Sequence, residues 1–495
     1  MYYPTKKEFI KKTKTGNLIP VYKEIIADTQ TPVSAYKQIA HGDKFSFLLE
    51  SVERGEQLGR YSFIGTNPEI VFKCKNNKGS LLYKHKEKQV SLSDGPFPFL
   101  RHMMNKYRFV INDSLPPFCG GAVGYFSYDV IRFIEKLSIH TTDDLNLPDC
   151  VLMFTDTIVI FDHLLHKMKI VSNVHLNDKT DPSKAYNQAI QKIDRIIEKL
   201  NMSMPMQKHR NKNPKGKYKL KSNLTKNQFT KIVKKAKEYI KAGDIIQTVL
   251  SQRLRTKINV DSFDIYRALR IINPSPYMYY LKLDSFEIAG SSPETLVKVE
   301  NKTVKERPIA GTRPRGKTEI EDKELVKELL SDPKELSEHV MLVDLSRNDV
   351  GRVCKYGTVK VGELMSIEKY SHVMHIVSDV QGKIKPDLDS VDVLKACFPA
   401  GTVSGAPKIR AMELIEEFEP TRRGPYAGAV GYLSFSGDMD TCIIIRTAII
   451  KNNTAYLQAG AGIVADSVPE KEYNETLNKA KVLIKAIKLA EEGLI

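Results

Sequence analysis

The chain has 495 residues, of which 41% are hydrophobic and 27% charged, and its formal net charge is +17 at pH 7. This composition is typical of a globular protein long enough for two core units, and no apolar run reaches the length of a membrane span. The start of the chain has no apolar core behind its lysines, so we expect no signal peptide. The six scattered cysteines, with no CxxC, favour free thiols in a reducing cytoplasm.

The positive charge raises one alternative, a basic protein that binds nucleic acid. The Lys and Arg residues are mostly spread along the chain, and the densest cluster, 208–217, contains no interleaved aromatic residue. We interpret this cluster as a solvated linker, and we expect neither nucleic acid nor a membrane as partner. A general positive potential would also help to gather a dianionic substrate.

The first part of the chain, 18–205, is predicted as an N-terminal unit of strands and short helices. The patterns predict strands at 45–51, 61–65, 151–154 and 157–161, and a helix at 183–200. A basic linker is placed at 206–223, where the sequence becomes polar.

The second part, 224–491, alternates between helical and strand patterns. We predict helices at 225–242, 263–272 and 470–491, and strands at 245–254, 278–282 and 286–289. The fold class is therefore α/β or α+β, with large and mostly antiparallel sheets.

One segment of the first part is echoed in the second. Gly-Ala-Val-Gly-Tyr-Phe-Ser at 121–127 recurs as Gly-Ala-Val-Gly-Tyr-Leu-Ser at 428–434. We predict that both are strands and that the two parts pack related sheet strands against each other.

A helix is predicted around Glu335 and Glu338, with Leu336, Val340 and Val343 as its buried stripe. Carboxylates three residues apart leave one face of a helix and repel each other. Alone, this pair is more typical of a solvated acidic face than of a cation site.

A second acidic pair, Glu472 and Glu475, has the same spacing in the final helix. The stripe predicted for that helix, on roughly the opposite side, is Leu477, Ala480, Ile484 and Ile487. Four carboxylates without Cys or His at ligand spacing favour a hard ion that keeps some of its waters, and Mg²⁺ is the expected one.

Two glycine-containing segments resemble anion-binding backbone. The turn at 401–408 leads into a helix, and the strand at 458–464 is interrupted by two glycines. Both could equally be tight turns.

Two polar residues fall in apolar strand patterns. Arg446, in 441–448, needs an anionic partner, either a structural carboxylate or a substrate. His375, in 370–377, is by itself more typical of a hydrogen-bonded core residue than of a catalyst. Composition and spacing thus indicate a magnesium-dependent site for a carboxylated small molecule.

Several motifs taken together resemble the chorismate-utilising enzymes, most closely the anthranilate synthase component I family. They are PIAGTRPRG at 308–316, ELSEH at 335–339, VDLSRND at 343–349, the turn at 401–408, the Gly-Ala-Gly strand and the final ExxE. The resemblance implies that family's fold, expected here as two large sheets packed as a sandwich with helices outside. It also implies conversion of chorismate to anthranilate and pyruvate with Mg²⁺, the first step of tryptophan biosynthesis. The ammonia would come from glutamine through a separate glutamine amidotransferase subunit.

The resemblance also assigns roles to residues. Glu338 and Glu475 are expected as direct metal ligands, and Glu335 and Glu472 as holding metal-bound waters. The chorismate-binding set is Gly311, Thr312, Tyr426, Arg446, Gly460, Ala461 and Gly462. The catalytic set is His375 for proton transfer during pyruvate loss, Glu294 as general acid for the departing 4-hydroxyl, and Thr402 near the ring.

Two positions distinguish this family from related chorismate-utilising enzymes. Ala310 stands where many aminodeoxychorismate synthases carry a lysine that can attack the ring, and Gln247 where isochorismate and salicylate synthases carry a lysine that activates water. Both substitutions favour ammonia as the nucleophile. Component I of aminodeoxychorismate synthase remains the nearest alternative.

A regulatory site is implied by resemblance as well. Ser51, with Pro276, Tyr277 and Met278, resembles the two halves of the family's tryptophan feedback site. On pattern alone these residues are an ordinary strand end and a proline-stopped helix. The chain shows no glutaminase constellation, so we expect it to use free ammonia by itself and glutamine only with its partner.

Overall fold

The computed structural model describes residues 1–51, 59–83, 86–202, 220–370 and 373–494. Most of the predicted linker, 206–223, and part of the segment after Ser51 therefore lie outside the described residues. Within these ranges no helix is both long and apolar enough to cross a lipid bilayer.

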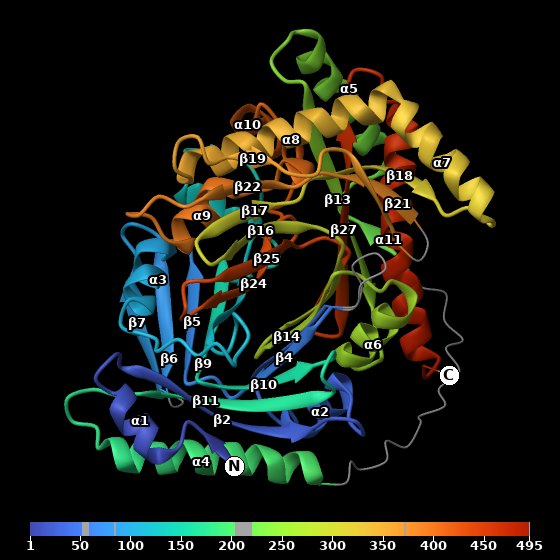
Figure 1. Cartoon of the computed structure of the whole chain (residues 1–495). Helices are drawn as coiled ribbons and strands as arrows, with labels where there is room; N and C mark the ends of the chain where they lie inside the picture. The colour runs from blue at the N-terminus through green and yellow to red at the C-terminus, as the bar shows by residue number, and fades with distance from the viewer. Residues whose placement is uncertain (52–58, 84–85, 203–219, 371–372, 495) are drawn as a thin grey trace.

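Two large antiparallel sheets form the body of the protein (Figure 1). Over the described residues the first sheet has 13 strands, in the order β1 (Tyr2–Tyr3), β2 (Leu18–Ile26), β11 (Lys167–His175), β10 (Thr157–Asp162), β4 (Tyr61–Thr66), β3 (Phe45–Glu50), β14 (Tyr277–Leu283), β15 (Glu287–Ser292), β26 (Thr447–Lys451), β27 (Thr454–Ile463), β13 (Gln247–Lys257) and β12 (Lys221–Ser222), with β23 (Gly405–Ala406) also on β13.

The second sheet has 11 strands in the described part of the chain, in the order β19 (Lys360–Val361), β22 (Val380–Lys383), β17 (Thr303–Glu306), β16 (Thr295–Glu300), β25 (Met439–Ile443), β24 (Ala429–Ser434), β8 (Gly121–Phe126), β9 (Cys150–Thr155), β5 (Ile70–Lys75), β6 (Lys78–Tyr83) and β7 (Lys86–Ser91). A small third sheet orders β18 (Ile309–Pro314), β21 (Val373–Val377) and β20 (Ser366–Lys369).

Helices lie on the outer faces of the sheets (Figure 1). They are α1 (Lys6–Lys12), α2 (Pro32–Ile39), α3 (Pro96–Met104), α4 (Pro182–Asn201), α5 (Lys226–Lys241), α6 (Ser262–Ile272), α7 (Glu319–Ser331), α8 (Pro333–Val353), α9 (Ser390–Cys397), α10 (Lys408–Phe418) and α11 (Pro469–Glu491), with short 3₁₀ turns η1 (Tyr128–Phe133) and η2 (Gly401–Val403).

Three apolar layers hold this arrangement together. The inner layer, which includes the fully buried Tyr125 and Tyr279, lies between the two large sheets. A second layer packs α2, α4, α6 and α11 against the first sheet. A third packs α3 and α9 against the second sheet, and α5 and α10 against β13 of the first. The predicted sandwich with helices outside is confirmed.

Both large sheets combine strands from the two predicted units. β3 pairs with β14 in the first sheet, and β8 pairs with β24 in the second. The echoed segments are therefore both strands, and they are direct neighbours: Gly124 stands opposite Gly431. The division into 18–205 and 224–491 stays a prediction, and the sheets run across it.

Three predictions about local structure need correction. The buried stripe of α8 does not include Val340, which is 52% exposed; Val343 is buried as predicted, and His339 and Leu342 face inward with it. In α11 the buried positions include Thr476 and Leu483 rather than Leu477 and Ile484, which are only partly buried. In both helices the surrounding sheets, more than the local apolar spacing, decide which face is covered.

The predicted strand across Arg446 is also wrong. β25 ends at Ile443 and β26 begins at Thr447, and Arg446 lies in the break with φ +52°. The chain leaves one sheet there and enters the other, so no strand could continue through this residue.

Candidate active site

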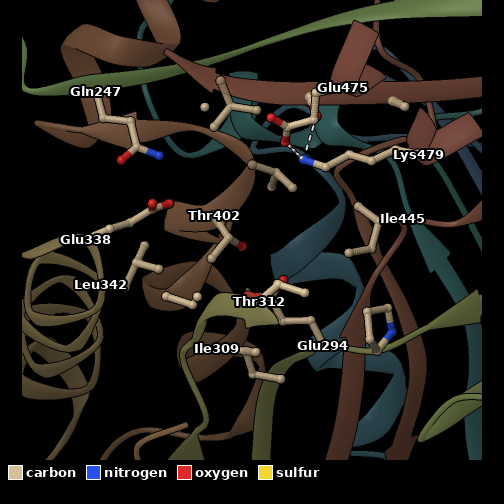
Figure 2. Close-up of a pocket in the computed structure, with 18 of the residues that line it drawn as sticks. Gln247, Glu294, Ile309, Thr312, Glu338, Leu342, Thr402, Ile445, Glu475 and Lys479 are labelled. Atoms are coloured by element: carbon tan, nitrogen blue, oxygen red, sulfur yellow. Dashed lines mark hydrogen bonds and ion pairs between the residues drawn. The ribbon is translucent and has the colours of Figure 1, made fainter. Parts of the chain in front are cut away.

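A cavity of about 490 Å³ lies where β13 and β27 meet α8, α11 and the small third sheet (Figure 2). Its lining combines residues that are far apart in sequence. Of the residues singled out above it contains Glu294, Gly311, Thr312, Glu335, Glu338, His375, Thr402, Tyr426, Arg446, Gly460, Gly462, Glu472 and Glu475. Ala461 does not line it: successive strand side chains alternate, and this one is fully buried in the core.

The two acidic pairs approach the cavity from different helices. Glu338 extends from α8 on one side, and Glu475 lies across the cavity on α11 (Figure 2). Burial, followed by repulsion from Glu335, raises the pKa of the Glu338 carboxyl, and Glu475 adds to the effect. The charge of Glu475 on α11 therefore affects the protonation of Glu338 on α8.

Each pair already has a basic neighbour. Arg313 Nη1 donates to Glu335 Oε1 at 3.0 Å, and Lys479 Nζ lies 2.7 Å from Glu475 Oε1. As the described side chains stand, no three His, Cys, Asp or Glu residues are close enough together to enclose a metal ion.

The donor set nevertheless fits a hard divalent cation. Burial raises the pKa of Glu472, and the proximity of Glu475 raises it further. Carboxylates that repel each other in a half-buried cavity are stabilised by an ion bound between them, and oxygen-only donors suit Mg²⁺.

Arg446 provides a place for an anion. The side chain is mostly buried, and burial lowers the pKa of its guanidinium. Nη1 donates to the backbone carbonyl oxygen of Lys479 at 2.8 Å, and among the described residues no carboxylate forms an ion pair with Arg446. A buried cation in this state favours an anionic ligand.

Glycines bring backbone close to the cavity. A Cβ atom at Gly460 would lie 2.7 Å from the Tyr426 hydroxyl, and one at Gly462 would lie 2.8 Å from Gln247 Nε2. Gly311 has φ +62° and sits in a bulge between β18 and β21. Side chains at these positions would displace the cavity wall.

His375 lies on β21, as expected. Its Nδ1 is 3.0 Å from the carbonyl oxygen of Gly311 and 3.0 Å from Thr312 Oγ1. Burial lowers its pKa, so the ring is neutral near pH 7. With the Nδ1 proton donated to the Gly311 carbonyl, Nε2 keeps a lone pair able to accept a proton.

Glu294 is buried in the loop between β15 and β16, and burial raises the pKa of its carboxyl to about 7. Such a group holds its proton up to neutral pH and can serve as a general acid. Thr402 faces the same space, and its hydroxyl partly offsets the effect of burial on the pKa of Glu294.

Sequence reasoning missed several residues of the cavity wall. Lys334, Gln458 and Lys479 all line it. The only available signal was for Lys479, which stands one helical turn after Glu475.

The second predicted site lies away from this cavity, at the junction of β3 and β14. Met278 pairs with Glu50 in the register, which brings Tyr277 beside Ser51. The Tyr277 hydroxyl bonds to Thr295 Oγ1 and Asp440 Oδ1, each at 2.9 Å. The two sequence segments therefore meet, while residues 52–58, which follow Ser51, are not described.

Comparisons with known proteins agree with this geometry. The family model described as chorismate binding enzyme matches residues 44–485. The chain is 50% identical to the anthranilate synthase component 1 of Acetivibrio thermocellus, covering 99% of this chain and 100% of that protein. It is 49% identical to the component 1 of Aquifex aeolicus, covering 98% of both.

Solved structures show the same relationship. The crystal structure of anthranilate synthase component I from Streptococcus pneumoniae superposes with a TM-score of 0.76 at 36% identity, covering 93% of this chain and 98% of that one. The menaquinone-specific isochorismate synthase of Escherichia coli, at 18% identity and a TM-score of 0.71, shares the fold.

Proposed function

Because this chain belongs to the chorismate-binding enzymes, with anthranilate synthase components 1 as its full-length relatives, we propose that it is a lyase converting chorismate and ammonia to anthranilate and pyruvate. The observation that carries the proposal is one cavity that joins a buried arginine with no carboxylate partner among the described residues, two facing acidic helices and a buried glutamic acid whose pKa is raised. We place this reaction in the cytoplasm, as the first step of tryptophan biosynthesis.

The carboxylates of the substrate determine where it binds. Arg446 would hold the enolpyruvyl carboxylate, since it is the buried cation of the cavity that lacks a carboxylate partner in the described chain. The ring carboxylate would face Glu338 and Glu475, with Glu335 and Glu472 behind them. Mg²⁺ held by these residues would neutralise that carboxylate and draw electrons from the reacting ring.

Two residues would move protons. Glu294, protonated near neutral pH, would donate to the departing 4-hydroxyl as ammonia adds to the ring. His375, neutral and with Nδ1 tied to the Gly311 carbonyl, would transfer a proton during the loss of pyruvate. Thr402 would contact the ring region.

The proposed nucleophile is ammonia. At the two positions where related enzymes carry a lysine for attack on the ring or activation of water, the cavity is lined by Ala310 and Gln247, and neither side chain can do so. We propose that a glutamine amidotransferase subunit supplies the ammonia in the cell.

We also propose feedback inhibition by tryptophan at Ser51, Pro276, Tyr277 and Met278. The support is that β3 and β14 are adjacent in the first sheet, so these residues share one surface. Hydrogen bonds connect this segment to Arg446 in the cavity. Asn273 Nδ2, just before the segment, donates to Ser291 Oγ at 2.9 Å, and Ser291 N donates to the Arg446 carbonyl oxygen at 3.2 Å.

One reaction mixture tests the proposal. The chain is incubated with chorismate, Mg²⁺ and ammonium at slightly alkaline pH, and the products are identified. Anthranilate with pyruvate is expected; an amino-dienoate that keeps its enolpyruvyl group would select aminodeoxychorismate synthase instead. Glutamine in place of ammonium should give no product without the partner subunit. An unchanged rate with added tryptophan would remove the regulatory part.

A further inference from the structure

Lys479 forms an ion pair with Glu475, a carboxylate that the proposed function assigns to the metal. Its Nζ lies 2.7 Å from Glu475 Oε1 and donates to the carbonyl oxygen of Gly460 at 2.9 Å. Figure 2 shows the side chain lying across the top of the cavity with its ammonium turned to Glu475. The amine therefore bridges the acidic helix α11 and the glycine strand β27.

The basic neighbour of the other acidic pair is held differently. Arg313 contacts Glu335 at 3.0 Å, Glu328 at 2.9 Å and Asp332 at 2.9 Å. Losing Glu335 would leave this guanidinium with two carboxylates. Among the described residues Lys479 forms an ion pair with Glu475 alone, so a cation that takes Glu475 removes its only acidic partner.

We propose that Lys479 is a placeholder cation that neutralises Glu475 in the metal-free protein and is displaced into the cavity when Mg²⁺ binds. This inference rests on the proposed function, because it needs Glu475 to be a metal ligand. An ammonium and a divalent ion that contact one carboxylate repel each other, so each weakens the binding of the other. The metal-free protein thus keeps the carboxylate paired, and Mg²⁺ must compete with the lysine.

The displaced amine can contact the substrate. Its side chain is 37% exposed and already lines the cavity, so it can turn towards a substrate carboxylate without disturbing the helix. A substrate that accepts this amine removes the competitor from Glu475. Binding of metal and binding of a carboxylated ring are then mutually favourable.

The test measures metal affinity rather than turnover. Mg²⁺ alone is titrated calorimetrically into the full chain and into Lys479→Gln, Lys479→Met and Lys479→Arg. The two neutral variants should bind Mg²⁺ at least about fivefold more tightly than the wild type. Lys479→Arg should bind it like the wild type, since it restores the pair with Glu475.

Lys481→Gln is the matched control. It removes the same charge from the same helix, but within the described part of the chain Lys481 bonds only to Asn478 Oδ1, on the exposed face. Its Mg²⁺ affinity should stay within about twofold of the wild type. Equal or weaker binding by both neutral variants, or equal tightening by the control, would overturn the placeholder role. If no form bound Mg²⁺, with or without chorismate, the metal site of the proposed function would fail, and this inference with it.

Discussion

The Tyr426 hydroxyl occupies the space into which a side chain at Gly460 would project, with only 2.7 Å between its oxygen and a Cβ atom there. Strand β27 can therefore approach the cavity only because position 460 has no side chain. A tyrosine with a pKa raised by burial to about 12 stays protonated and offers its proton to a ligand.

Gly460→Ala should raise the KM for chorismate by about tenfold or more, because the new methyl group moves the Tyr426 hydroxyl. Steady-state kinetics with saturating ammonium and Mg²⁺ measure this. Gly460→Ala should also lower the free energy of unfolding, and adding Tyr426→Phe should recover part of that loss. Gly351→Ala, in α8, is the control and should leave KM unchanged, because beyond its own helical turn no described atom lies within 4 Å of its Cβ position. An unaltered KM in Gly460→Ala would contradict the assigned wall.

Arg446→Met should weaken chorismate binding by at least about 100-fold, since it removes a charged hydrogen-bond donor from the anion site. The same change should leave the free energy of unfolding equal or higher, because a buried charge without a carboxylate partner is removed. Chemical denaturation and substrate titration measure the two quantities.

Arg423→Met is the informative contrast. Arg423 is also buried, but its Nη2 donates to Glu419 Oε1 at 2.7 Å. Its loss should cost about 3–5 kcal/mol of stability. If Arg446→Met destabilised the protein as much, Arg446 would be a structural residue.

Glu294→Gln should lower kcat by about 10²–10⁴-fold with little change in KM, because the acid that protonates the leaving hydroxyl is lost. In the wild type, kcat/KM at a constant concentration of free ammonia should fall as pH rises through about 7. The variant should lack that limb. A variant that kept the same pH limb would exclude Glu294 as its origin.

The same carboxyl affects stability. Its folded pKa of about 7 lies above the usual value of 4.5, so its contribution is complete in acid and is lost as pH rises through 7. Relative to Glu294→Gln, the wild type should lose up to about 3 kcal/mol between about pH 4 and about pH 8. Denaturant unfolding at several pH values checks this.

Glu338→Gln should lower activity by more than about 100-fold and weaken Mg²⁺ binding, while the protein stays folded. The stability at pH 8 should not fall, because burial and Glu335 already raise the pKa of this carboxyl. Glu324→Gln, on the exposed face of α7, controls for loss of one negative charge. Full turnover in Glu338→Gln would show that the metal assignment is wrong.

Sequence patterns predicted the parts of the fold that local spacing determines. Helices at 183–200, 225–242 and 470–491 match α4, α5 and α11 to within one residue at each end. The echoed strands were found because the two segments have nearly the same sequence. Val340 was misplaced because apolar spacing shows a possible buried face, whereas the packing of α8 against β22 and α9 decides the actual one.

The candidate site was predicted mostly through motif resemblance, and tertiary contacts account for the rest. Spacing could pair Glu335 with Glu338, but it could not show that α11 faces α8 across one cavity. It also could not show that Arg446 lies in a break between two sheets, since the flanking residues are as apolar as a strand. Arg313 escaped notice because its carboxylate partners become neighbours only in the fold, whereas the spacing of Lys479 one turn after Glu475 was visible in the sequence and was overlooked.

The pairing of β3 with β14 and of β8 with β24 has a consequence for assembly. A chain cut between residues 202 and 220 would yield two fragments, each holding an unfinished share of both sheets and an open row of strand hydrogen bonds. Neither fragment should be stable in isolation, yet mixed together they should reassociate and restore turnover. The two parts should therefore act as one folding unit, because each completes both sheets of the other.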